Sequence, residues 1–133
     1  MIVVDTTVWV DHLNDTMTPQ VSRLRDIILS RVAIIVVGDV VLCEVLQGLS
    51  SDREAALVER ALRRFRVVPM VTPELASKSA AGYRALRTRG ITVRKTIDLL
   101  IGTFCIKHDH LLLHNDRDYD HMERYLGLSV VRS

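Results

Sequence analysis

Four carboxylates lie where the neighbouring side chains are apolar. Asp5 follows an apolar run at the start of the chain, and Asp116 comes shortly after a second run at 111–113. Glu44 and Asp98 each lie within an apolar stretch of helical pattern. An ionised carboxylate in apolar surroundings is costly unless a positive group pairs with it. A hard divalent cation, which binds oxygen ligands, is the simplest partner that all four acids could share.

Convergence of these four acids would itself require a cation. Two unit charges about 5 Å apart repel by roughly 3 kcal/mol at an effective dielectric constant of about 20. Several such pairs would cost more than a domain of ordinary stability can absorb. One or two Mg²⁺ or Mn²⁺ ions would reverse the sign, activate water for attack on a phosphodiester and stabilise the leaving oxygen. The pattern therefore indicates a metal-dependent enzyme.

Each acid also has a purely structural interpretation. Asp5, Asp116 and Asp118 can cap the helices that follow them, and Asp98 can interact with the positive end of its own helix. Glu44 is harder to explain in this way, because it lies near the middle of a predicted helix with valines at neighbouring positions. We therefore expect Glu44 to face or border the core.

The elements that must position these acids follow from the alternation of short apolar runs with helical patterns. The predicted strands are residues 2–4, 33–37, 65–70, 111–113 and 128–131. The residues predicted to begin helices are Thr6 or Thr7, Thr18, Gly38, Ser51, Pro73, Thr96 and Asp118. Apolar strands alternating with helices indicate an α/β fold, with a parallel sheet flanked by helices on both faces. Ligands gather at the carboxyl ends of such strands, where Asp5 and Asp116 are expected.

The composition indicates one folded domain over residues 1–133. Hydrophobic residues make up 48% of the chain and aromatic residues 5%, which predicts an aliphatic core. The formal net charge of +2 neither indicates nor excludes a nucleic-acid partner. Arginine suits bidentate contacts to phosphate, although solvated helix faces are the alternative interpretation of charged clusters. The two clusters are Arg60, Arg63, Arg64 and Arg66, then Arg84, Arg87, Arg89, Arg94 and Lys95.

The two cysteines, Cys43 and Cys105, lie at apolar positions of helical segments. We expect both to be buried free thiols, because two cysteines form no disulfide framework. A reduced, cytoplasmic setting fits this pattern. The chain begins directly with a strand-like run, so no signal peptide is predicted. No apolar segment reaches about 18 residues, so we expect no membrane span.

Four stretches of the sequence resemble one known family. They are residues 4–9 (VDTTVW), 44–48 (EVLQG), 95–101 (KTIDLLI) and 113–120 (LHNDRDYD). Together they are similar to the PIN domain, and more narrowly to the VapC toxins of bacterial toxin–antitoxin pairs, over essentially the whole chain. The resemblance implies that the metal-binding and catalytic acids are Asp5, Glu44, Asp98 and Asp116. It further implies Asp118 as an auxiliary acid and Thr7 as a supporting hydroxyl, with Asp120 as an alternative in the last motif.

The same resemblance implies a function. It describes an Mg²⁺- or Mn²⁺-dependent endoribonuclease that forms homodimers and assembles with a cognate VapB-type antitoxin. The RNA substrate and the number of metal ions stay open. The basic residues expected to guide RNA phosphates past the acidic pocket are Arg84, Arg87, Arg94 and Lys95.

Three other interpretations are weaker. A zinc site would need the histidines at 108, 110, 114 and 121, but their spacing matches no standard site. A receiver-like phosphotransfer module would need adjacent acids after the first strand and a late lysine, whereas Asp5 stands alone and no lysine follows residue 107. A non-catalytic binding module would not need all four acids.

The single tryptophan, Trp9, is expected to pack in the first helix.

Overall fold

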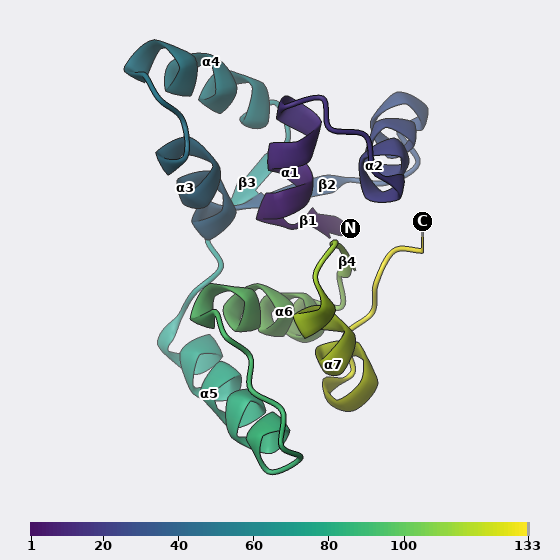
Figure 1. The fold of residues 1–133 in the computed structure, drawn as a ribbon, viewed down its shortest axis with the longest axis vertical. Coiled ribbons are helices and arrows are strands. Elements are labelled where there is room, and N and C mark those ends of the chain that lie inside the picture. Colours follow the sequence, from purple (N-terminus) through teal and green to yellow (C-terminus); the bar gives the residue numbers. More distant parts are fainter. Residues whose placement is uncertain (133) are drawn as a thin grey trace.

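A four-stranded parallel sheet forms the centre of the fold (Figure 1). This computed structural model describes residues 1–132. The strands are β1 (Ile2–Val4), β2 (Ile35–Gly38), β3 (Arg66–Val68) and β4 (Leu111–Leu113), in the order β3-β2-β1-β4. In the register, Val3 of β1 lies between Val36 and Leu112. The carboxyl ends of β1 and β4 are therefore neighbours.

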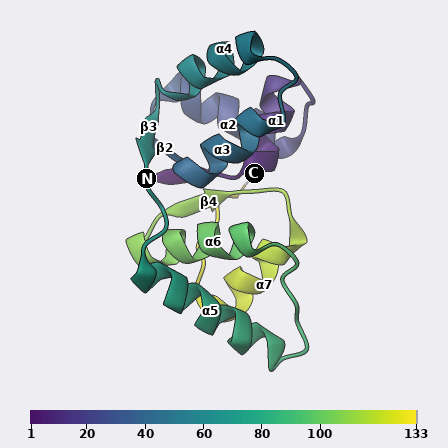
Figure 2. The ribbon, with the colours of Figure 1, turned by 90° about the vertical axis from the view of Figure 1, so that its left-hand side faces the viewer.

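Seven helices in the described part of the chain cover both faces of the sheet. Figures 1 and 2 show α1 to α4 grouped on one side and α5 to α7 on the other. The first group is α1 (Thr6–Leu13), α2 (Pro19–Ser30), α3 (Asp39–Gln47) and α4 (Asp52–Leu62). The second group is α5 (Pro73–Arg87), α6 (Thr96–His108) and α7 (Arg117–Leu126). This arrangement confirms the predicted α/β class with helices on both faces of a parallel sheet.

The core is aliphatic, as the composition predicts. All three residues of β1 are buried, and Trp9 packs in the core with 1% exposure. The centre of α6 is packed so closely against α7 that a side chain at position 102 would require Met122 to move. A Cβ added to Gly102 would lie 2.2 Å from Cε of Met122. No helix within residues 1–132 combines the length and apolar character needed to cross a membrane.

Three helix starts differ from the prediction. The observed N-caps are Asp5, Lys95 and Asp116, in place of Thr6 or Thr7, Thr96 and Asp118, although the structural interpretation of the acids already allowed caps at Asp5 and Asp116. Asp5 and Asp116 have the extended backbone angles of N-cap residues (ψ of 156° and 131°). The helices therefore start one or two residues earlier than the side chains alone suggest.

Two further predictions were wrong. Residues 128–131 form no strand, and only an isolated bridge pairs Val130 with Leu112. Cys43 is exposed, whereas Cys105 is buried as expected. Cys43 lies on α3 between the buried Leu42 and the half-buried Glu44, so a single residue of helical rotation carries it from the core face to solvent.

Candidate active site

The sheet brings two of the predicted acids to the same edge. Asp5 follows β1 directly, and its backbone N–H donates to the Leu113 carbonyl of β4 at 2.9 Å. Asp116 lies three residues beyond Leu113, at the start of α7. Both acids are thus at the carboxyl ends of neighbouring parallel strands, where ligands bind in such sheets.

Three carboxylates form the tightest cluster in the described chain. One oxygen from each of Asp98, Asp116 and Asp118 lies within 4.8 Å of the others. Asp98 reaches the cluster from the first turn of α6 and is 6% exposed, while the other two are half-buried. The backbone N–H of Asp118 donates to Oδ1 of Asp116 at 2.9 Å. This bond fixes the orientation of Asp116 in the cluster.

Asp5 lies beside this cluster but outside it. Its Oδ1 accepts a hydrogen bond of 2.9 Å from the Tyr119 hydroxyl, and its Oδ2 accepts one of 3.1 Å from Thr7. The Tyr119 oxygen is also 3.4 Å from Oδ1 of Asp98. The predicted supporting residue Thr7 therefore contacts Asp5. Tyr119 has no assigned role in the sequence analysis, although it links the first and third acids.

Glu44 is half-buried on α3 and is likewise not in the cluster of three. Its Oε1 accepts a hydrogen bond of 2.7 Å from the hydroxyl of Thr6. This contact joins α3 to the first residue of α1, which follows Asp5 directly in the sequence. Sequence reasoning missed Thr6 as a partner, because the capping interpretation assigned its hydroxyl to the backbone.

The electrostatics of the site show a surplus of negative charge. Burial, followed by the charge of Asp5, raises the pKa of Asp98 from 3.8 to about 6, although the nearby Lys95 opposes this rise. Burial also raises the pKa of Asp5, against the hydrogen bonds from Tyr119 and Thr7. Carboxylates crowded in this way favour a neighbouring cation. The all-oxygen donor set fits a hard divalent ion such as Mg²⁺ or Mn²⁺.

The alternative groups in the last motif lie elsewhere. Asp120 is exposed and sits 4.0 Å from Nε2 of His114. Burial lowers the pKa of His114, which favours its neutral form. His108 and His110 stack on each other with ring centroids 5.8 Å apart. Within residues 1–132, no histidine joins a cluster of metal-binding side chains, so the structure gives the zinc interpretation no support.

The four basic residues expected to contact RNA are all exposed. Arg84 and Arg87 line a cavity of about 540 Å³ between α5 and α6, which Thr96 also lines. Lys95, the N-cap of α6, lowers the pKa of Asp98 by its charge and therefore lies near the acids. Arg94 precedes it in the same loop.

Comparison with known proteins identifies the family. The fold and the family model described as PIN domain, which matches residues 2–125, define a PIN domain protein. Ribonuclease VapC11 of Mycobacterium tuberculosis is 30% identical over 132 residues, covering 98% of each chain. VapC ribonuclease Mb1587 of Mycobacterium bovis matches to the same extent. The chain therefore belongs to the PIN domain family, and within it to the VapC ribonucleases.

Solved structures share the fold at lower identity. VapBC2 from Rickettsia felis, bound to a DNA fragment of its promoter, matches with a TM-score of 0.72 and 20% identity, covering 98% of both chains. FitAcB from Neisseria gonorrhoeae matches with a TM-score of 0.72 and 19% identity, covering 99% of this chain and 97% of the other. VapC20 of Mycobacterium tuberculosis, described as a sarcin-ricin loop cleaving toxin, matches with a TM-score of 0.65 and 18% identity, covering 90% and 93%. These similarities agree with the PIN-like sheet described above.

Proposed function

We propose that this chain is the endoribonuclease toxin of a toxin–antitoxin pair and hydrolyses RNA phosphodiester bonds with Mg²⁺ or Mn²⁺. The observation that carries the proposal is the close approach of Asp98, Asp116 and Asp118 in a member of the PIN domain family. Three carboxylates at this separation repel one another when ionised, and a divalent cation with oxygen ligands relieves that repulsion.

The site residues divide into holders of the ion and residues beside it. We assign the ion to Asp98, Asp116 and Asp118, with Asp5 and Glu44 completing the acidic wall as ligands or as the groups that orient water. When bound, the ion supplies activated water and stabilises charge on the leaving oxygen. The catalytic acids in this proposal are Asp5, Glu44, Asp98 and Asp116.

Two hydroxyl groups support these roles from α1. Thr7 donates to Asp5 and Thr6 donates to Glu44. Each hydrogen bond leaves at least one lone pair of the carboxylate free for an ion or a water molecule. The helix thereby holds both acids in fixed orientations, as positioning residues do in metal sites.

RNA must bring phosphates towards this negatively charged site, so it needs cations beside the acids. We propose that Lys95 and Arg94 contact the phosphates nearest the acids, because they precede α6 directly. Arg84 and Arg87 would bind phosphates farther along, at the cavity between α5 and α6. RNA as the substrate implies a cytoplasmic location.

The proposed partner is a VapB-type antitoxin, and the toxin is expected to form homodimers that assemble with it. Support comes from structures of the same fold that contain both components, such as VapBC2 of Rickettsia felis and VapBC-1 of nontypeable Haemophilus influenzae. We also propose that residues 1–133 form a single domain, which agrees with the match of the PIN model to residues 2–125.

Growth of a bacterial host tests the proposal. Expression of the chain alone should arrest growth, and co-expression of the small protein encoded beside it should restore growth. Asp116→Asn should abolish the arrest, whereas Asp120→Asn, which changes an exposed acid outside the cluster, should preserve it. Soluble expression of the unmodified chain without any arrest would favour the non-catalytic binding module instead.

A further inference from the structure

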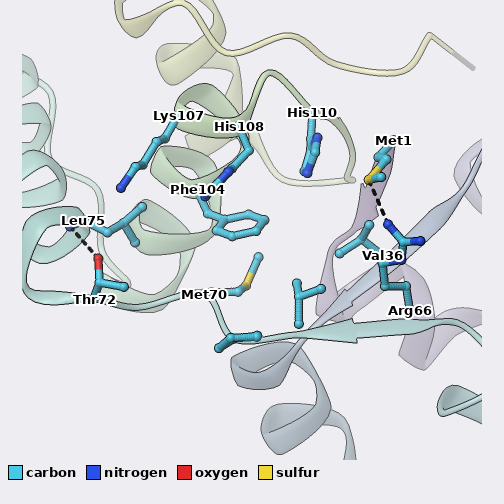
Figure 3. Close-up of a pocket in the computed structure, with 12 residues that line it drawn as sticks. Met1, Val36, Arg66, Met70, Thr72, Leu75, Phe104, Lys107, His108 and His110 are labelled. Atoms are coloured by element: carbon cyan, nitrogen blue, oxygen red, sulfur yellow. Dashed lines mark hydrogen bonds between the residues drawn. The ribbon is translucent and has the colours of Figure 1, made fainter.

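A second cavity lies between the sheet and the C-terminal half of α6 (Figure 3). Its volume is about 340 Å³, near the lower end of the ~300–1,000 Å³ typical of ligand pockets. Asp98 and His108 lie at opposite ends of α6. The helical rise of about 1.5 Å per residue separates their backbones by about 15 Å. The cavity is therefore distinct from the acidic site.

The interior of this cavity is apolar and contains an aromatic ring. Phe104 is 5% exposed, and Figure 3 shows it facing Met70 and Val36 across the cavity. The ring of Phe104 lies 4.4 Å from that of His108 and 5.8 Å from that of His110, measured between centroids. Three planar rings thus meet at one end of α6. His108 is the exposed ring of the three, and an exposed aromatic ring can stack on a nucleobase in any sequence.

The rim of the cavity is basic. Arg66 and Lys107 line it, on opposite sides in Figure 3, and no Asp or Glu of the described chain does. Arg66 is exposed, and the contact found for its guanidinium is a weak one of 3.9 Å to Sδ of Met1. Lys107 lies 3.5 Å from Oε2 of Glu74, an exposed carboxylate, so this ion pair is weak. Both cations are therefore available to an anionic ligand.

We propose that this cavity binds one nucleotide unit, with the base beside the exposed ring of His108 and the phosphate at Arg66 on the rim. An aromatic ring binds the base by stacking, and the Arg66 guanidinium forms charge-assisted hydrogen bonds to the phosphate. The nucleotide is either a segment of single-stranded RNA or a free mononucleotide. The first source rests on the proposed function, because it makes the cavity a second contact for the RNA substrate.

Binding to the metal-free protein in EDTA tests this inference, because it does not depend on cleavage. Adenosine monophosphate is titrated by calorimetry, and a labelled single-stranded RNA by fluorescence anisotropy. Arg66→Gln should weaken mononucleotide binding about tenfold, as expected for losing a hydrogen bond to a charged group. Arg53→Gln is the matched control, since Arg53 is an exposed arginine on α4 that does not line the cavity.

A second variant should have the opposite effect. Glu74→Gln releases Lys107 from its ion pair, which adds free positive charge on the opposite side of the rim and should strengthen binding of the anionic nucleotide. If RNA occupies the cavity, Arg66→Gln should also lower the slope of log K against log salt by about 0.7, the value for one phosphate contact on a single strand. A change in mononucleotide binding without a change in this slope identifies the free nucleotide as the ligand.

Two results would overturn the inference. The first is that neither mononucleotide nor RNA binding differs between Arg66→Gln and Arg53→Gln. The second is that ribose 5-phosphate binds as tightly as adenosine monophosphate, because the cavity would then contact no base. If the unmodified chain cleaved no RNA in Mg²⁺, this result would count against the proposed function. It would leave the result for mononucleotide binding unaffected.

Discussion

The substitution Asp98→Asn distinguishes a metal ligand from an aspartate that merely stabilises a helix end. Burial and the charge of Asp5 raise the pKa of Asp98 from 3.8 to about 6. The difference is about 2 pKa units, and each unit corresponds to 1.36 kcal/mol, so ionisation of Asp98 costs the folded protein about 3 kcal/mol. Asparagine has nearly the same shape and no charge, so it should avoid this cost.

The pH dependence gives this prediction a sign. A raised carboxyl pKa means that the folded state binds the proton more tightly than the unfolded state does. The contribution of the protonated Asp98 to folding stability is fully present below pH 3.8 and is lost as the pH rises through about 6. In EDTA at about pH 8, Asp98→Asn should therefore exceed the unmodified protein in stability by up to about 3 kcal/mol, and the gain should shrink towards pH 4.

Urea unfolding monitored by circular dichroism measures both curves. Asp52→Asn serves as the control, because Asp52 is an exposed acid in the first turn of α4, and this variant should be slightly less stable than the unmodified protein at about pH 8. Addition of Mg²⁺ should stabilise the unmodified protein but not Asp98→Asn. The reasoning would be refuted if Asp98→Asn lost roughly 0.3–1 kcal/mol in EDTA at about pH 8, which is the loss expected for a simple helix-dipole contact.

Three further predictions follow from contacts in and around the site. Tyr119→Phe removes the hydroxyl that bonds the first acid and should weaken Mn²⁺ binding about tenfold or more, measured by calorimetry; unchanged affinity would contradict the assigned role. Gly102→Ala places a Cβ against Met122 and should cost about 1–3 kcal/mol in urea unfolding, so a neutral effect would show that this packing can relax. Iodoacetamide should label the exposed Cys43 and spare Cys105, whose pKa burial raises to about 12; equal labelling in a mass spectrum would show that the core opens.

Much of the fold is encoded locally. The apolar runs at 2–4 and 111–113 match β1 and β4 to the residue, and Thr18 and Ser51 cap α2 and α4 as predicted. Other boundaries depend on neighbours in space. The strand expected at 128–131 is reduced to one bridge, in which the backbone groups of Ser129 and Val131 hydrogen-bond to Leu112 of the edge strand β4. The spacing of apolar residues and the residue types at helix caps carry no information about such contacts between distant segments.

The four motifs gave the candidate acids, and the α/β pattern indicated that Asp5 and Asp116 follow strands of one parallel sheet. The sequence did not predict which acids cluster together and which accept hydrogen bonds from neighbouring hydroxyl groups. One oxygen from each of Asp98, Asp116 and Asp118 lies within 4.8 Å of the others, whereas each oxygen of Asp5 accepts a hydrogen bond from a hydroxyl group. The second cavity has no linear motif, because its rings and cations come from segments that are far apart in the sequence.

The most direct test of the central claim is cleavage of a labelled RNA by the purified, metal-free chain. We expect no cleavage in EDTA, recovery on addition of Mg²⁺ or Mn²⁺, and a loss of several orders of magnitude in Asp116→Asn at saturating metal. The cluster of three acids would then act as the metal site. Full activity of the metal-free chain in EDTA, or an Asp116→Asn variant as active as the unmodified protein, would contradict this account.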